Sequence, residues 1–89
     1  IIEESHMAEV TYYGADWCSD CRRSKAQLES LGVAFEEKNV EQEASFATEA
    51  ESISGRKNIP VIVFQDGEFL VEPSNADLEA ALAKRSLIG

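Results

Sequence analysis

Four short apolar runs along the chain predict β-strands. They are rich in Val, Ile, Phe and Tyr, the β-branched and aromatic residues that favour extended backbone. The run Val61-Ile62-Val63-Phe64 contains no polar residue and predicts a buried central strand. Asp66-Gly67, which follows it, is typical of a two-residue hairpin turn. The expected strands cover residues 8–13, part of 33–40, 61–64 and 69–71.

Apolar residues at intervals of three and four predict three helices between these strands and after the last one. The first is expected to begin near Cys18 and to end at Gly32, because glycine accommodates the left-handed backbone that ends many helices. The second is expected over residues 41–54. The third is expected to begin at Ser74, since Ser74 and Asp77 have the form of a capping box.

The resulting order, β-α-β-α-β-β-α, predicts one small α/β domain. The first two strands should be parallel and joined by a right-handed crossover, and the last two should form an antiparallel hairpin. We therefore expect a mixed four-stranded sheet flanked by helices. Residues 1–6 fit none of this pattern, and Ser5-His6-Met7 is typical of a cloning junction. We expect a tag remnant at residues 1–6 and the domain at residues 7–89.

The charge of the chain limits the partners that it can bind. Its 89 residues include 8 basic and 17 acidic side chains, for a net charge of −9. Phosphate backbones and anionic membranes attract concentrated Lys and Arg, so neither is an expected partner. The sequence contains no apolar run near the roughly 20 residues of a membrane helix and no basic stretch followed by an apolar one. We expect a cytoplasmic monomer.

Both cysteines of the chain lie in Trp17-Cys18-Ser19-Asp20-Cys21, where the first expected strand gives way to the first helix. A Cys-x-x-Cys at such a junction is typical of a thiol–disulfide redox site. Zinc usually needs four ligands, and beyond residues 1–6 the sequence has two thiols and no histidine, so no metal site within one chain is expected. A metal or iron–sulfur site shared between chains and an inert pair of thiols are the alternatives.

The two cysteines are expected to have different roles in disulfide exchange, which needs an attacking thiolate and a resolving thiol. Cys18 should lie at the helix start, where free backbone N–H groups and the helix dipole stabilise a thiolate. Cys21 lies one turn further in, so we expect it to be buried and to resolve the mixed disulfide. Asp16 and Asp20 oppose a thiolate at Cys18, but a unit charge about 4 Å away in water costs only ~1 kcal/mol. The stabilisation of the Cys18 thiolate by the helix start is expected to be larger than this repulsion.

Four motifs together with the order of elements resemble the glutaredoxin family of the thioredoxin superfamily, and within it the actinobacterial mycoredoxins. The resemblance covers residues 7–86. Ser19-Asp20 stands where glutaredoxins usually have Pro-Tyr and mycoredoxins Gly-Tyr. Val71-Glu72-Pro73-Ser74 stands where glutaredoxins have the Gly-Gly that helps to hold glutathione. The motifs are Trp17-Cys18-Ser19-Asp20-Cys21, Ile59-Pro60-Val61, Asp66-Gly67 and Glu72-Pro73-Ser74.

The resemblance implies a thiol–disulfide oxidoreductase with no bound cofactor and a redox-active disulfide between Cys18 and Cys21. Its substrates would be mixed disulfides between proteins and a low-molecular-weight thiol. Mycothiol is expected rather than glutathione, because it lacks glutathione's paired carboxylates and the Gly-Gly is absent. The alternatives are a thioredoxin-like electron donor, for example to ribonucleotide reductase, that a flavin reductase recycles, or a non-catalytic iron–sulfur or metal-binding protein.

The resemblance also implies a substrate groove beside the cysteines. Pro60 would be a cis-proline facing them, and Ile59 would pair with a bound peptide-like thiol. Trp17 is equally consistent with a wall of this groove and with a core aromatic residue. Ser74 and Asn75 are most simply a helix cap, with a contact to the thiol ligand as the alternative. The expected substrate-binding residues are Trp17, Tyr13, Ile59, Pro60, Ser74 and Asn75.

Overall fold

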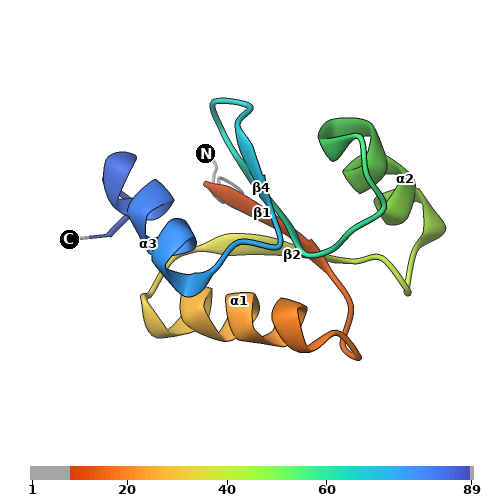
Figure 1. Ribbon diagram of the computed structural model, residues 1–89, viewed down its shortest axis with the longest axis horizontal. Coiled ribbons are helices and arrows are strands. Elements are labelled where there is room, and N and C mark those ends of the chain that lie inside the picture. The colour runs from red at the N-terminus through yellow and green to blue at the C-terminus, as the bar shows by residue number, and fades with distance from the viewer. Residues whose placement is uncertain (1–8, 89) are drawn as a thin grey trace, which may run out of the picture.

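The computed structural model describes residues 9–88 and contains the predicted order of elements (Figure 1). The predicted boundary between a tag remnant at residues 1–6 and a domain at 7–89 lies outside the described residues at both ends. Within residues 9–88, no helix is long and apolar enough to cross a membrane. The elements are β1 (Val10–Gly14), α1 (Ser19–Ser30), β2 (Phe35–Asn39), α2 (Ala44–Ser54), β3 (Val61–Phe64), β4 (Phe69–Val71) and α3 (Asn75–Lys84).

The four strands form one mixed sheet in the order β2-β1-β3-β4, which confirms the predicted topology. β1 and β2 are parallel, with Val10 opposite Phe35. β3 is antiparallel to both β1 and β4, with Val61 opposite Val71 in the hairpin. The apolar run of β3 therefore lies in the interior of the sheet, as its composition predicts.

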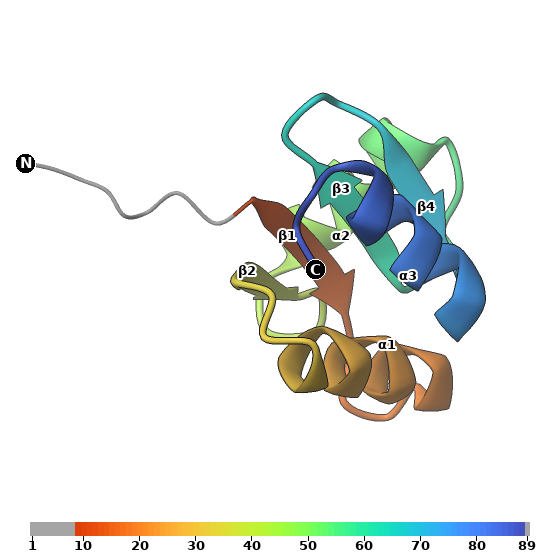
Figure 2. The same ribbon diagram turned by 90° about the vertical axis from the view of Figure 1, so that its left-hand side faces the viewer.

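Helices cover both faces of the sheet, with α1 and α3 on one side and α2 on the other (Figures 1 and 2). Because successive strand residues point to opposite faces, the neighbours Tyr12 and Tyr13 enter different clusters. Tyr12 packs with the α1 and α3 residues Leu28 and Leu78. Tyr13 packs with Ala50 of α2. The β1 strand thus joins two separate apolar layers.

Local hydrogen bonds determine where the helices begin and end. Ser74 Oγ accepts a hydrogen bond from the backbone N–H of Asp77 (3.0 Å), which confirms the predicted cap of α3. Gly55 has a φ of 76° and ends α2. The helix begins later than the predicted Glu41 because Asn39 Oδ1 accepts the Glu41 N–H (2.9 Å) and holds this segment in a turn.

The packing of α3 gives a stability prediction. Leu78 is completely buried, whereas its neighbour Glu79 is exposed. Leu78→Ala is expected to lower the free energy of unfolding by about 2–5 kcal/mol, because it removes apolar contacts and leaves a cavity. The matched control Glu79→Ala should change it by less than about 0.5 kcal/mol. Urea unfolding measures both values, and similar losses in the two variants would contradict this packing.

Candidate active site

Cys18 is the N-cap residue of α1, so its side chain lies among the free N–H groups of the first turn. Its sulfur accepts a hydrogen bond from the backbone N–H of Cys21, at a distance of 3.3 Å. Its own N–H donates to Ala15 O (3.3 Å), and its carbonyl accepts from the Arg22 N–H (3.0 Å). The side chain is only half-buried, so a substrate can reach this sulfur.

Cys21 lies one turn further along α1 and is completely buried. Burial raises the pKa of its thiol to about 12, and the neighbouring Cys18 contributes to the increase. The backbone of Ala15 and the hydroxyl of Tyr12 have the opposite, smaller effect on this pKa. At neutral pH Cys21 is therefore a protonated thiol beneath the accessible sulfur of Cys18.

The loop before β3 forms the second side of the site. The Ile59–Pro60 peptide bond is cis, as the resemblance implies. Pro60 is buried, and its carbonyl accepts a hydrogen bond from the Glu72 N–H (2.9 Å) at the end of β4. The carbonyl of Ile59 lies 4.0 Å from the Cys18 sulfur. The fold thus brings residues 41 positions apart to the same point.

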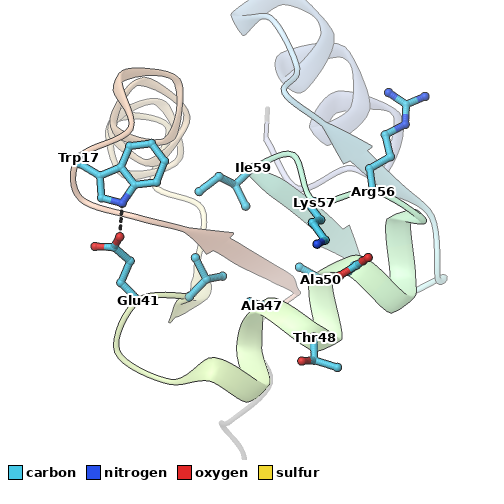
Figure 3. A pocket seen from close by; sticks show the side chains of 10 residues that line it. Trp17, Glu41, Ala47, Thr48, Ala50, Arg56, Lys57 and Ile59 are labelled. Carbon is cyan, nitrogen blue, oxygen red and sulfur yellow. Dashed lines mark hydrogen bonds between the residues drawn. The ribbon is translucent and has the colours of Figure 1, made fainter.

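A cavity of about 420 Å³ opens between Trp17, Ile59 and the helix α2 (Figure 3). Trp17 precedes Cys18 in the chain, and the Ile59 carbonyl lies 4.0 Å from the Cys18 sulfur. The side chain of Trp17 is 63% exposed, so the alternative that it is a core aromatic residue is wrong. Its indole N–H donates a hydrogen bond to Glu41 Oε2 across the mouth of the cavity. Ala47 and Ala50 supply part of the apolar floor.

The cavity carries charges of both signs that the list of expected site residues did not include. Its lining contains the carboxylates of Glu41 and Glu51 and the basic residues Arg56 and Lys57. In Figure 3 the Lys57 side chain is directed toward α2, whereas Arg56 is directed away from Trp17 and Glu41. The basic doublet Arg56-Lys57, which only Asn58 separates from Ile59-Pro60, was the available sequence signal. No comparable signal marks the two glutamates, which come from the turn before α2 (Glu41) and from α2 itself (Glu51).

The other expected binding residues do not line this cavity. Tyr13 is buried on the α2 face, where its hydroxyl donates to Glu49 Oε1 (3.0 Å). Ser74 caps α3, and the carbonyl of Asn75 accepts from Gln27 Nε2 (2.8 Å). The structure places Ser74 and Asn75 beside α1, so a contact of either residue or of Tyr13 with substrate stays a prediction.

The charged residues around the cysteine motif are engaged with one another or with the backbone. Arg22 donates to the carbonyl of Asp16 (2.7 Å). Arg23 pairs with Asp20 (3.4 Å) and donates to the carbonyl of Pro73 (3.1 Å), which connects α1 to the turn before α3. Both members of the Arg23–Asp20 pair are 45% exposed, so the pair contributes little stability. It does place a cation beside the carboxylate within the cysteine motif.

Comparison with known proteins identifies the family. The Glutaredoxin family model matches residues 10–70. The chain belongs to the glutaredoxin family. Its glutaredoxin fold and its motif Cys18-Ser19-Asp20-Cys21 agree with this membership.

Named glutaredoxins match most of the chain. Over 78 residues it is 32% identical to "Putative glutaredoxin Rv3198A" of Mycobacterium tuberculosis, which covers 86% of this chain and 93% of that protein. It is 39% identical over 56 residues to Glutaredoxin 3 of Escherichia coli (strain K12), which covers 63% of this chain and 68% of that protein. The crystal structure of glutaredoxin grx-1 from Archaeoglobus fulgidus superposes with a TM-score of 0.74 at 29% identity, over 88% of this chain and 92% of that one.

The chain is therefore a thiol–disulfide oxidoreductase of the glutaredoxin type. Disulfide exchange needs only sulfur atoms and protons, and this family requires no bound cofactor. Among residues 9–88, no group of three or more His, Cys, Asp and Glu side chains is arranged to hold a metal ion.

The different burial of the two cysteines gives a labelling prediction. Because burial raises the pKa of the Cys21 thiol to about 12, this thiol stays almost entirely protonated at pH 8. Iodoacetamide should therefore modify Cys18 more than tenfold faster than Cys21 in the reduced, folded protein. Peptide mapping by mass spectrometry measures the two rates. In denaturant the rates should become similar, whereas similar rates in the folded protein would refute the assignment of Cys21 as a buried neutral thiol.

Proposed function

We propose that this glutaredoxin reduces mixed disulfides between proteins and a low-molecular-weight thiol, with Cys18 as the nucleophile and Cys21 as the resolving thiol. The Cys18 thiolate attacks the mixed disulfide and forms a new S–S bond, while one of the two substrate sulfurs leaves as a thiolate and takes up a proton. A second thiol, or Cys21, then attacks the sulfur of Cys18 and releases the remaining group. The substrate gains two electrons and the attacking thiols lose two.

The observation that carries this proposal is the contrast between the two sulfurs at the start of α1. The Cys18 sulfur is accessible and accepts the Cys21 N–H, a bond that stabilises a thiolate more than a neutral thiol. The Cys21 thiol is buried, and its pKa is raised to about 12. The nearby Ile59 carbonyl gives a bound peptide-like thiol a backbone partner next to Cys18. Each feature favours Cys18 as the first nucleophile.

Mycothiol is the preferred low-molecular-weight thiol in this proposal, and glutathione is the alternative. Glutathione carries two carboxylates, so its site needs compensating positive charge. The cavity presents Glu41 and Glu51 alongside Lys57, while Arg56 is directed outward. Its charge is thus poorly matched to a ligand with two carboxylates and better matched to a ligand without paired carboxylates. The Val71-Glu72-Pro73-Ser74 segment, which lacks Gly-Gly, favours the same choice.

The remaining parts of the proposal concern the groove and the partners. Trp17, Ile59 and Pro60 would form walls of the groove, and Ser74, Asn75 and Tyr13 would complete it if bound substrate extends toward α3 and β1. The protein substrates would carry a mixed disulfide or a disulfide of their own. We propose that the protein acts as a cytoplasmic monomer.

The choice of thiol can be tested in single turnovers, which need no recycling reductase. One model protein carrying either mycothiol or glutathione on the same cysteine is mixed with excess reduced enzyme. The mycothiol form should be reduced at least about tenfold faster, corresponding to about 1.4 kcal/mol in transition-state binding. Faster reduction of the glutathione form would refute the preference.

The charges of the cavity provide a second arm of this experiment. Glu41→Gln keeps an oxygen that can accept the Trp17 hydrogen bond and removes one negative charge. It should raise the rate with the glutathione form several-fold, because a nearby unit charge is worth ~1 kcal/mol in water. The control Glu79→Gln removes an exposed charge on α3 and should leave the rate unchanged. Equal rates in Glu41→Gln and wild type would remove this electrostatic argument.

The proposed roles of the cysteines predict that their serine variants lose different activities. Cys18→Ser should abolish activity toward every disulfide substrate. Cys21→Ser should retain reduction of thiol–protein mixed disulfides, which an external thiol can complete, and should lose reduction of dithiol-type protein disulfides by at least about a hundredfold. Retained dithiol activity in Cys21→Ser would contradict the role of Cys21.

The same assays distinguish the alternative functions. A thioredoxin-like electron donor would accept electrons from a flavin reductase and would favour dithiol-type disulfides over both mixed disulfides. An iron–sulfur protein using Cys18 across a dimer would be coloured and would absorb visible light after purification without oxygen. Either result would contradict the proposal and support the corresponding alternative.

A further inference from the structure

Tyr12 places a phenol hydroxyl in the core directly beneath the cysteine motif. The side chain is 2% exposed and points from β1 toward α1. Its hydroxyl donates a hydrogen bond to the carbonyl of Cys21 at a distance of 3.0 Å. Phe35 of β2 packs against its ring edge-to-face, with ring centroids 6.0 Å apart. The hydroxyl is therefore held beside Cys21 by an aromatic contact as well as by its hydrogen bond.

Gly14, at the end of the same strand, leaves room for this arrangement. A Cβ atom added at Gly14 would lie 2.3 Å from the Tyr12 hydroxyl oxygen and 2.5 Å from the carbon that carries it. Real Cβ atoms do not approach other heavy atoms so closely, so any other residue at position 14 would displace the phenol. Residues 12 and 14 lie on the same face of the strand. The hydroxyl position thus depends on two residues of β1 together.

We propose that Tyr12 is a positioning residue for the resolving thiol: its hydroxyl fixes the first turn of α1 through the Cys21 carbonyl in the resting protein, and turns to donate to the Cys21 sulfur when that sulfur becomes negatively charged during disulfide exchange. The proposal rests on the roles of Cys18 and Cys21 given above. It assigns to a strand residue a function that the Cys-x-x-Cys motif alone does not contain.

The ionisation of the neighbouring groups supports this role. The Tyr12 hydroxyl lowers the pKa of Cys21, in opposition to the larger effect of burial. Burial, and after it the charge of Cys21, raises the pKa of Tyr12 above its usual value of 10.0, so the hydroxyl keeps its proton and remains a donor. The other ionisable groups that influence it are Glu37 of β2 and Cys18. Neither group carries a positive charge.

The step that Tyr12 would assist is the formation of the Cys18–Cys21 disulfide. The thiol of Cys21 loses its proton, and its sulfur attacks the Cys18 sulfur of the mixed disulfide. A Cys18–Cys21 bond forms, the bond from Cys18 to the substrate sulfur breaks, and the departing thiolate takes up a proton. Over the first attack by Cys18 and this second exchange together, the two cysteines lose two electrons and the substrate disulfide gains them. When an external thiol later attacks Cys18, Cys21 leaves as a thiolate beside the same hydroxyl.

Tyr12→Phe tests the inference because it removes the hydroxyl and keeps the ring. The mixed disulfide on Cys18 is prepared, and release of its thiol group is followed in a stopped-flow instrument between pH 7 and pH 10. Release should be about tenfold slower than in wild type, with its pH profile shifted to higher pH, because a hydrogen bond to a charged group is lost. In the Cys18→Ser background, alkylation of Cys21 should show the same shift.

Tyr13→Phe is the matched control, since it removes a buried phenol hydroxyl from the opposite face of the same strand. It should leave the pKa of Cys21 unchanged. Alkylation of Cys18 should differ by less than about twofold between Tyr12→Phe and wild type, which separates the resolving step from a general distortion of α1. Gly14→Ala, which displaces the phenol, should also raise the pKa of Cys21. Combining it with Tyr12→Phe should raise this pKa no further, because both variants remove the same hydroxyl contact.

Two results would overturn the inference. One is an unchanged rate and pH profile of thiol release in Tyr12→Phe. The other is an equal slowing of Cys18 alkylation and thiol release, which would mean that Tyr12 supports the fold of α1 and has no separate effect on Cys21. Failure of the proposed function would be recognised differently, as activity that survives Cys18→Ser.

Discussion

The packing of α1 against the sheet is the constraint on which the site depends. Leu28 and Cys21 are fully buried on the inner face of this helix, and the Tyr12 hydroxyl bonds to the Cys21 carbonyl. These contacts hold the start of the helix against the sheet, and its N-cap residue is Cys18. The accessible sulfur, the N–H group directed at it and the Ile59 carbonyl 4.0 Å away all follow from that placement.

The same packing makes two chemically identical side chains different. Cys18 caps the helix at the surface, whereas Cys21 lies one turn below it in the apolar layer. Desolvation favours the neutral thiol of Cys21, and the N–H groups at the helix start favour negative charge at Cys18. This difference between the two thiols is the basis of the proposed order of reaction, in which Cys18 attacks first. In the proposed mechanism the buried thiol of Cys21 must ionise to complete the exchange, and the Tyr12 hydroxyl donates a hydrogen bond to the backbone carbonyl of this residue.

The proposed selection of the substrate thiol involves a different layer of the molecule. The cavity beside Cys18 is bounded by Trp17 and by α2, which packs on the opposite face of the sheet from α1. Its glutamates and basic residues come from the segment between β2 and β3. Changes in α2 can therefore alter the charge of the cavity while the cysteines and their helix stay as they are. Because the two layers are separate, the same pair of cysteines can be combined with cavities of different charge.

The sequence by itself determined the order of elements, the topology of the sheet, the Ser74 cap and the motif that carries the chemistry, because these depend on local spacing and composition. It left Trp17 undecided between core and surface, placed the start of α2 too early and missed Glu41 and Glu51 in the cavity. Only the tertiary structure showed that the Tyr12 hydroxyl reaches Cys21 across the space left by Gly14. Such contacts join residues on different elements, and their distances depend on how a helix packs against a sheet, which no local pattern records.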